Sequence, residues 1–169
     1  MTTLLIIIFF LLLPTLIIVF LAILERRRKK VIKMALQEAI CQLVNENGLL
    51  IVEIEYFRNK AIGIDRKRKK LLFVAHYKGF VDKSCIDLET IAFCRVGKTK
   101  DEYSKDVNKV FIEVKNKGNT EIFRLVFYDR SFDPIDTKTS MIKKTEYWKN
   151  KINLHRRTVR FNYQFEYVL

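Results

Sequence analysis

The sequence predicts an α+β protein in which N-terminal helices precede an antiparallel, β-rich domain. Three observations carry this prediction: an uncharged apolar stretch opens the chain, an apolar stripe of helical period follows it, and from Leu49 onward apolar residues recur at every second position. A period near 3.6 is typical of a helix packed on one side, and a period of 2 is typical of a half-buried strand. The chain therefore divides into a first helix (1–24), a second helix (25–48) and a β-rich domain (49–169).

The first segment, from Leu4 to Leu24, contains no ionisable residue. As a helix rising about 1.5 Å per residue it would be roughly 30 Å long, which matches the hydrocarbon thickness of a bilayer. No Lys or Arg precedes it and no small-residue cleavage site follows it, so a cleaved signal peptide is not indicated. Pro14 would kink a membrane helix without breaking it. The segment is therefore predicted to be a transmembrane helix.

A run of cations follows this segment directly, and only the α-amino group precedes it. Because positive charge stays on the cytoplasmic side of a membrane helix, we expect a single-pass protein of the cell membrane with its N-terminus outside and its C-terminal domain cytoplasmic. Cys41, Cys85 and Cys94 agree, since they lack the spacing of a disulfide framework and are expected to be reduced, mostly buried thiols. The run is also a candidate surface for anionic lipid head groups, with these residues: Arg26, Arg27, Arg28, Lys29 and Lys30.

The overall charge is strongly positive, with 32 Lys and Arg against 19 Asp and Glu and a formal net charge of +13. Most of the excess lies in two short clusters, the run that ends at Lys33 and the stretch RKRKK at 66–70. No basic face and no recognised nucleic-acid motif accompanies them, so nucleic acid is not an expected partner. Membrane contact is the simplest use of both clusters, and a solvated turn is the alternative for the second.

The segment after the cationic run is predicted to be a juxtamembrane helix that ends near Gly48. Ile32, Leu36, Ile40 and Val44 stand four residues apart and form an apolar stripe. Glycine just beyond the last apolar position is a common helix stop. The stripe needs a partner, which is either the domain that follows or a second copy of the chain.

Short alternating segments then predict an antiparallel meander of strands. The basic stretch joins the second strand to the third as a turn, and the glycine-containing NKGNT at 116–120 predicts a hairpin between the last two. The predicted strands are Leu49–Phe57, Ala61–Asp65, Lys70–Tyr77, Leu88–Val96, Val110–Lys115 and Glu121–Tyr128.

The C-terminal part is predicted to contain a helix over about 137–153 and a final strand over 158–169. Trp148, the single tryptophan, lies on the apolar side of the helix, where a lone tryptophan is more often a core residue than a ligand platform. The final strand rests on unbroken alternation of these apolar residues with polar ones: Val159, Phe161, Tyr163, Phe165, Tyr167 and Leu169. We expect it to pair with the edge of its own sheet or of a partner's sheet.

A meander closed by one helix, with the hairpin AIGID-RKRKK-LLFV at its front and EYWKNKI near its end, resembles the pleckstrin-homology-like domains. The resemblance covers roughly 49–154, although five or six strands are visible instead of seven. It implies a partial barrel closed by the C-terminal helix. Lipid-binding members of that superfold grip anionic head groups with basic residues of the first hairpin loops, while other members act as protein scaffolds. The implied anion-binding residues are Arg66, Lys67, Arg68, Lys69 and Lys70.

No residue set indicates catalysis, a metal site or a bound cofactor. Asp129, Asp133 and Asp136 could approach a cation, but their spacing lacks the alternation of a calcium loop, and a polar loop that caps the helix explains them better. The sequence favours a membrane-anchored cytoplasmic binding or scaffold module that recognises anionic lipid or a protein partner. A structural subunit that self-associates is the alternative, and an enzyme with an unrecognised site is the least favoured.

Overall fold

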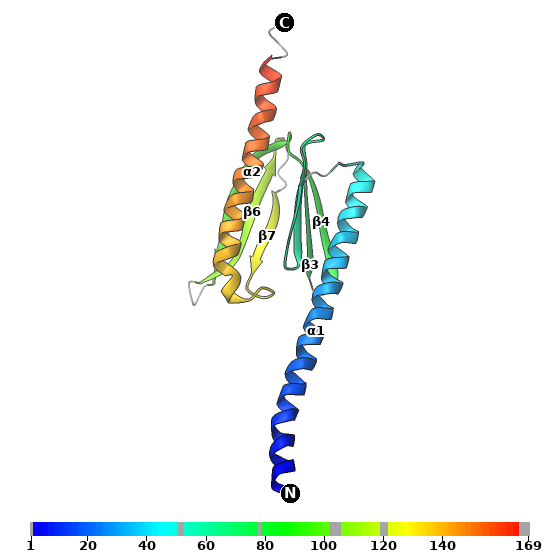
Figure 1. Ribbon diagram of the computed structural model, residues 1–169. Helices are drawn as coiled ribbons and strands as arrows, with labels where there is room; N and C mark the ends of the chain where they lie inside the picture. The colour runs from blue at the N-terminus through cyan, green and yellow to red at the C-terminus, as the bar shows by residue number, and fades with distance from the viewer. Residues whose placement is uncertain (1, 51–52, 78, 102–105, 119–121, 166–169) are drawn as a thin grey trace.

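The computed structural model describes the backbone of residues 2–50, 53–77, 79–101, 106–118 and 122–165, and within these ranges the side chains from 13 to 156. Figure 1 shows two helices on the flanks of two β-sheets. The elements in chain order are α1 (Thr2–Asn47), β1 (Glu53–Phe57), β2 (Lys60–Asp65), β3 (Lys70–Tyr77), β4 (Phe80–Asp87), β5 (Ile91–Lys100), β6 (Val107–Asn116), β7 (Ile122–Asp129), a short 3-10 helix (Ile135–Thr137) and α2 (Lys138–Phe165).

Both sheets are antiparallel meanders of strands that are consecutive in the chain. Sheet A has the order β1-β2-β3-β4, and sheet B has the order β5-β6-β7. Helix α1 lies against sheet A and α2 lies against sheet B, so the two helices cover opposite sides of the body (Figure 1). The main core forms where the face of sheet B that α2 covers meets the face of sheet A turned away from α1.

The main core joins residues of both sheets to the inner side of α2. Ile62, Phe73, Ile112 and Phe127 belong to one buried cluster with Trp148, whose side chain is fully buried. The indole Nε1 of Trp148 donates a hydrogen bond to Glu55 at 2.5 Å, which satisfies its polar atom. A buried tryptophan is stable when its N–H has such a partner. The prediction that Trp148 is a core residue is confirmed.

A second buried cluster holds the C-terminal half of α1 on sheet A. Leu36, Ile40 and Leu43 pack against Leu72 and Val74, which lie on the face of sheet A turned away from the main core. The apolar stripe of 25–48 therefore packs on the following domain. The helix ends as predicted at Gly48, which has a φ of +58° and donates its N–H to the Asn45 carbonyl.

The prediction of a transmembrane helix over 1–24 is contradicted. No helix in the part of the chain that the structure describes has a stretch long and apolar enough to cross a membrane. The described apolar run of α1 begins at Leu13 and ends before Glu25, so it is about 18 Å long at about 1.5 Å per residue, short of roughly 30 Å. The side chains of Leu4 to Leu12 lie outside the described residues. The predicted single-pass localisation and membrane orientation are corrected with it.

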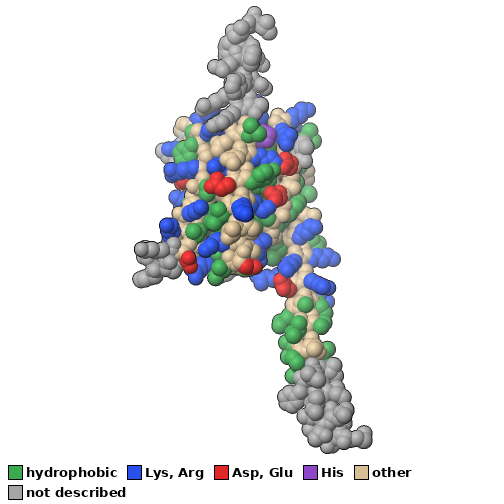
Figure 2. Space-filling model, turned by 60° about the vertical axis from the view of Figure 1, so that its left-hand side comes forward, with side chains coloured by type: hydrophobic (Ala, Val, Ile, Leu, Met, Phe, Trp, Pro, Cys, Tyr) green, Lys and Arg blue, Asp and Glu red, His purple; other side chains and the backbone are tan. Residues whose placement is uncertain are grey.

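Large apolar side chains of α1 are nevertheless exposed where the helix extends beyond the sheets. Figure 2 shows them below the cationic side chains of the same helix. Leu16, Ile18 and Phe20 are each more than 60 % exposed. Helix α1 is continuous through Pro14 and through the cationic run. The two helices predicted over 1–24 and 25–48 are therefore one element.

The predicted partial barrel is also contradicted, because the two sheets do not close on each other. Sheet A ends at β1 and β4, sheet B ends at β5 and β7, and no described strand of one sheet pairs with a strand of the other. The edge at β1 is instead bordered by α2, whose Lys144 and Lys151 form ion pairs with Glu55 and Glu53. Side-chain contacts with a helix take the place that strand pairing would occupy in a closed barrel.

The predicted final strand over 158–169 is wrong as far as the backbone is described. Helix α2 continues through Phe165, and residues 166–169 lie outside the described part of the chain. The segment 138–165 contains neither glycine nor proline. Adding a residue to an existing helix gains one backbone hydrogen bond without a new nucleation cost, so an uninterrupted helix extends through a segment whose side chains alternate.

Candidate functional site

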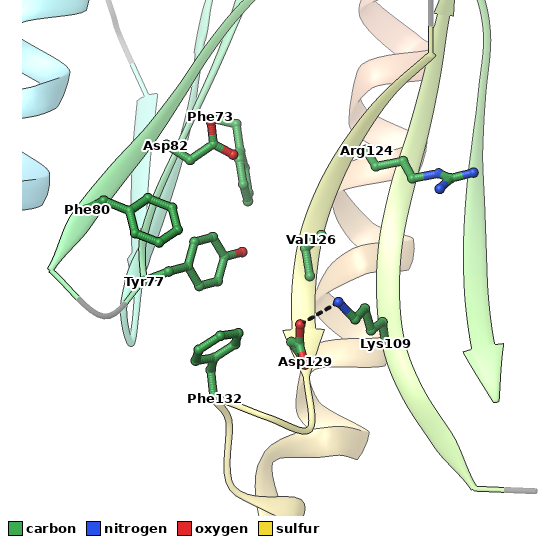
Figure 3. A pocket seen from close by; sticks show the side chains of 9 residues that line it. All are labelled: Phe73, Tyr77, Phe80, Asp82, Lys109, Arg124, Val126, Asp129 and Phe132. Carbon is green, nitrogen blue, oxygen red and sulfur yellow. Dashed lines mark ion pairs between the residues drawn. The ribbon is translucent and has the colours of Figure 1, made fainter. Parts of the chain in front are cut away.

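A slot with a volume of about 230 Å³ opens between the two sheets (Figure 3). Its wall on sheet A consists of side chains from β3 and β4, and its wall on sheet B comes from β6, β7 and the turn after β7. Figure 3 shows α2 behind sheet B, so the slot lies on the other face of that sheet. The lining residues are Phe73, Tyr77, Phe80, Asp82, Lys109, Arg124, Val126, Asp129 and Phe132.

Three aromatic rings form the mouth of the slot, where the ring of Tyr77 contacts the other two. The ring centroid of Tyr77 lies 5.9 Å from that of Phe80 and 5.2 Å from that of Phe132. Tyr77 and Phe80 are the last pair of the β3–β4 hairpin, so they project on the same face of sheet A. The chain reverses between them with Gly79 at a φ of +93°, a conformation that glycine adopts readily. Phe80 is 61 % exposed and Phe132 is 40 % exposed.

Backbone hydrogen bonds fix the turn that carries Phe132. The carbonyl of Asp129 accepts the N–H groups of Phe132 at 2.9 Å and of Asp133 at 2.7 Å. In return, the Asp133 carboxylate accepts the N–H of Asp129 at 2.9 Å, and the Asp129 carboxylate accepts the N–H of Ser131 at 3.0 Å. These reciprocal bonds close the turn on itself and hold Phe132 beside Tyr77.

A buried ion pair anchors this turn to β2 of sheet A. Lys60 on β2 donates to both carboxylate oxygens of Asp133, at 2.9 and 3.2 Å, and to Oδ1 of Asn59 at 2.9 Å. The side chains of Lys60 and Asp133 are each 1 % exposed. Burial lowers the pKa of Lys60, and the hydrogen bond and charge of Asp133 oppose that shift. The ammonium group lies 5.8 Å from the ring centroid of Tyr77.

Among the other polar groups of the slot, Asp129 is partnered and Tyr77 is neutral, whereas Asp82 is an exposed carboxylate. Lys109 lies 3.0 Å from Asp129, and this partner, together with hydrogen bonds from Ser131, outweighs burial and holds the pKa of Asp129 below its ordinary value. Burial raises the pKa of the Tyr77 hydroxyl, and nearby carboxylates add to the shift, so the phenol is neutral at physiological pH. The slot therefore offers an aromatic surface that is bordered by the ion pair between Lys109 and Asp129.

The size of the slot matches one side chain more closely than a whole small molecule. Pockets for drug-sized ligands occupy about 300–1,000 Å³. The described residues contain no group of three or more His, Cys, Asp or Glu side chains placed to hold a metal ion. Chemically, the slot can desolvate an apolar group and stack against it.

The predicted anion-binding turn, 66–70, lies at the other end of β3. Lys70 begins this strand and Tyr77 ends it, which separates the turn from Tyr77 at the mouth of the slot by about 23 Å at about 3.3 Å per residue. Four of its five cations contact acceptors within sheet A and its borders: Arg66 with Glu53 at 3.3 Å, Arg68 with the Asn47 carbonyl at 3.0 Å, Lys69 with Glu89 at 2.6 Å and Lys70 with Asp87 at 2.7 Å. Lys67 is exposed. Anion binding by the turn stays a prediction.

The first basic cluster, Arg26 to Lys30, is exposed on α1 and does not converge with that turn. Arg68 contacts α1 at Asn47, the last residue of the helix. Along the helix, Lys30 and Asn47 are separated by about 26 Å at about 1.5 Å per residue. Within the cluster, Lys29 forms an exposed ion pair with Glu25 at 2.7 Å. The two clusters therefore present separate surfaces.

The aromatic slot was not predicted from the sequence, although parts of its signal were present. Tyr77 and Phe80 flank a Lys-Gly pair, which is a hairpin signal that would have placed both rings on one face. Asp129 and Asp133, interpreted as a polar loop, act as such a loop and fix Phe132 within it. The meeting of these two segments depends on how the sheets pack, which local patterns do not encode.

Comparisons of this chain with family models, with curated proteins and with solved structures find no match. Function is therefore argued from the geometry and chemistry of the chain itself.

Proposed function

We propose that this protein is a binding module that captures a protein partner by taking one apolar side chain of that partner into the slot. The observation that carries the proposal is the contact between Tyr77, Phe80 and Phe132, in which two of the three rings stay at least 40 % exposed. Exposed aromatic clusters mark interaction sites more often than scattered apolar residues do. Aromatic side chains also dominate the binding energy of protein interfaces.

The rigidity of the slot supports the same proposal. A ring that is already fixed loses little conformational freedom on binding, so more of the contact energy appears as affinity. The reciprocal hydrogen bonds between Asp129 and Asp133 fix Phe132, and the β3–β4 hairpin fixes Tyr77 and Phe80. Burial of one large apolar side chain contributes about 1.5–3 kcal/mol. Contacts between the partner and the surface around the slot must supply the rest of the binding free energy.

The alternative ligand, an anionic lipid head group at 66–70, is less favoured by the charges of the turn. Lys69 and Lys70 are each within 2.7 Å of a carboxylate, and an anion would compete with those partners. An enzyme is also less favoured. Burial raises the pKa of the Cys94 thiol to about 12, which keeps it from acting as a nucleophile at neutral pH.

Selection of displayed peptides on the full chain tests this proposal. We expect enriched peptides to share one aromatic or large aliphatic residue, and we expect Phe80→Ala and Phe132→Ala to weaken their binding by about tenfold or more, the loss of one buried aromatic contact. Leu50→Ala is the matched control, because Leu50 is 60 % exposed and lies outside the slot. Equal binding by all three variants would refute the slot as the binding site.

Self-association is a second candidate function, favoured by the exposed apolar surface of α1. Leu16 and Phe20 lie one turn apart on one side of the helix, Ile18 projects from the opposite side, and all three remain uncovered in the single chain. Burial of such a surface between copies would be favourable. Light scattering of the full chain over a range of concentrations tests this candidate. Oligomers that disappear in Leu16→Glu/Phe20→Glu would support it, and a monomer at every concentration would exclude it.

A further inference from the structure

A pair of arginines flanks a buried glutamate on the face of sheet B that borders the slot. In the strand register, Glu113 of β6 stands between Arg95 of β5 and Arg124 of β7. Residues that share a row project on the same face of a sheet. Glu113 is only 5 % exposed on this outer face, because the two arginine side chains cover it.

Both guanidinium groups are held in place. Nε of Arg95 donates to Glu113 at 2.8 Å, and a terminal nitrogen of Arg124 lies 3.8 Å from the other carboxylate oxygen. The Arg95 guanidinium lies 5.3 Å from the ring centroid of Phe93, and that of Arg124 lies 5.4 Å from Phe111. Such cation–π contacts and the shared carboxylate fix the orientation of the groups before any ligand binds.

Donors and charge remain available at this pair. A guanidinium carries five N–H donors, and the side chains of Arg95 and Arg124 are 67 % and 64 % exposed. Glu113 supplies one negative charge against two positive charges, so the group is left with one unbalanced cation. One bound carboxylate would balance that positive charge. A phosphate dianion would bring two negative charges, which is more than the one unbalanced positive charge can neutralise.

Arg124 connects this pair to the slot. Its stem lines the slot beside Val126, while its guanidinium reaches across β6 (Figure 3). The row that contains Val126 is two residues from the row of Arg124, which corresponds to about 6.6 Å along the strand. An extended peptide that lies along β7 would therefore place residues two apart at the slot and at the arginine pair.

We propose that Arg95 and Arg124 bind a carboxylate side chain of the partner, about two residues from the apolar side chain that enters the slot. This inference rests on the proposed function and specifies the chemistry of the partner: an acidic peptide segment with one large apolar residue. Bidentate contacts with carboxylates are the geometry that guanidinium groups favour. Because the donors are exposed, the contribution of the carboxylate should decrease as ionic strength rises.

The test uses the full chain and synthetic peptides with a central Phe, made in matched pairs that carry Glu or Gln two residues away on either side. We expect the Glu peptide to bind about tenfold more tightly than its Gln partner, the effect of a hydrogen bond to a charged group. Arg95→Gln should abolish this difference, since Arg95 lies outside the slot lining. Lys98→Gln is the control, because it removes an exposed charge from the same strand, three residues from Arg95 and on the opposite face of the sheet.

The outcomes separate this inference from the proposed function. If the Glu and Gln peptides bind equally and neither binds to Phe80→Ala, the proposed role of the arginine pair is overturned and the slot remains the binding site. Failure of both peptides to bind would overturn both proposals. A phosphoserine peptide that binds more than about tenfold tighter than the Glu peptide would overturn the assignment of a carboxylate ligand.

Discussion

The ammonium group of Lys60 lies 2.9 Å from the carboxylate of Asp133, which is 73 residues later in the chain, and both side chains are buried. This pair joins β2 of sheet A to the turn that follows β7 of sheet B. It is thus a direct link between the two sheets beside Tyr77 of the slot.

Removing one member of this pair should destabilise the fold strongly. Lys60→Met leaves the Asp133 carboxylate buried without its partner, and we expect a loss of about 3–5 kcal/mol in the free energy of unfolding. Lys60→Met/Asp133→Leu should recover much of that loss, because an apolar pair of similar size leaves no unpaired charge. Urea denaturation of the full chain measures both. A double variant no more stable than Lys60→Met would contradict the account of the pair.

Gly97 should not tolerate a larger residue. A Cβ atom at this position would lie 2.3 Å from the ring of Phe111, which occupies the space above the glycine. We expect Gly97→Ala to destabilise the protein by about 1–3 kcal/mol through overpacking. Gly97→Ala/Phe111→Leu should be more stable than the single variant, as measured by thermal unfolding. The absence of such rescue would show that the contact with the ring is not the cause.

Stability should decline in acid partly through Asp65. Burial alone would raise the pKa of this carboxyl, but N–H donors from Arg68, Leu50 and Lys67 outweigh burial and hold the pKa below its ordinary value. A carboxyl whose pKa is lower in the folded state stabilises the fold above its unfolded pKa of about 3.9, and this contribution is lost as pH falls through the folded value. Asp65→Asn should therefore flatten the dependence of unfolding free energy on pH in this range. An unchanged slope would contradict the role of Asp65.

Trp148 should report unfolding by its fluorescence. It is the only tryptophan, is fully buried and donates to Glu55. We expect blue-shifted emission in the folded state that moves to longer wavelength on unfolding. Trp148→Ala should lower stability by about 3–5 kcal/mol because it leaves a cavity in the main core. A red emission maximum under native conditions would contradict the burial of this residue.

Local patterns predicted most of the strands and the helix that carries Trp148. The third strand was predicted with its observed bounds, Lys70–Tyr77, because a continuous apolar run from Leu71 to Ala75 is flanked by turns that contain charged residues. The strand Phe80–Asp87 was missed, since an edge strand needs little burial and four of its eight residues are polar or charged without regular alternation. Cys41 was expected to be a buried thiol and is exposed on α1.

The larger errors arose where local pattern and tertiary context disagree. The alternation of Val159 to Phe165 suggested a strand, yet this segment continues α2 without a helix-breaking residue. The aromatic slot could not be predicted, because Phe132, in the turn after β7, meets Tyr77 of sheet A only through the packing of the two sheets. Periodicity records which side of an element is apolar; it does not record which element that side meets.

Hydrogen exchange of the full chain, with and without a selected peptide, tests the central claim most directly. If the slot binds the partner, the backbone amides around Tyr77 and Phe80 and those from Asp129 to Asp133 should exchange more slowly in the complex, while the turn at 66–70 should be unchanged. Protection confined to the turn at 66–70 or to α1, with no change around Tyr77 and Phe132, would contradict the claim that the slot is the binding site.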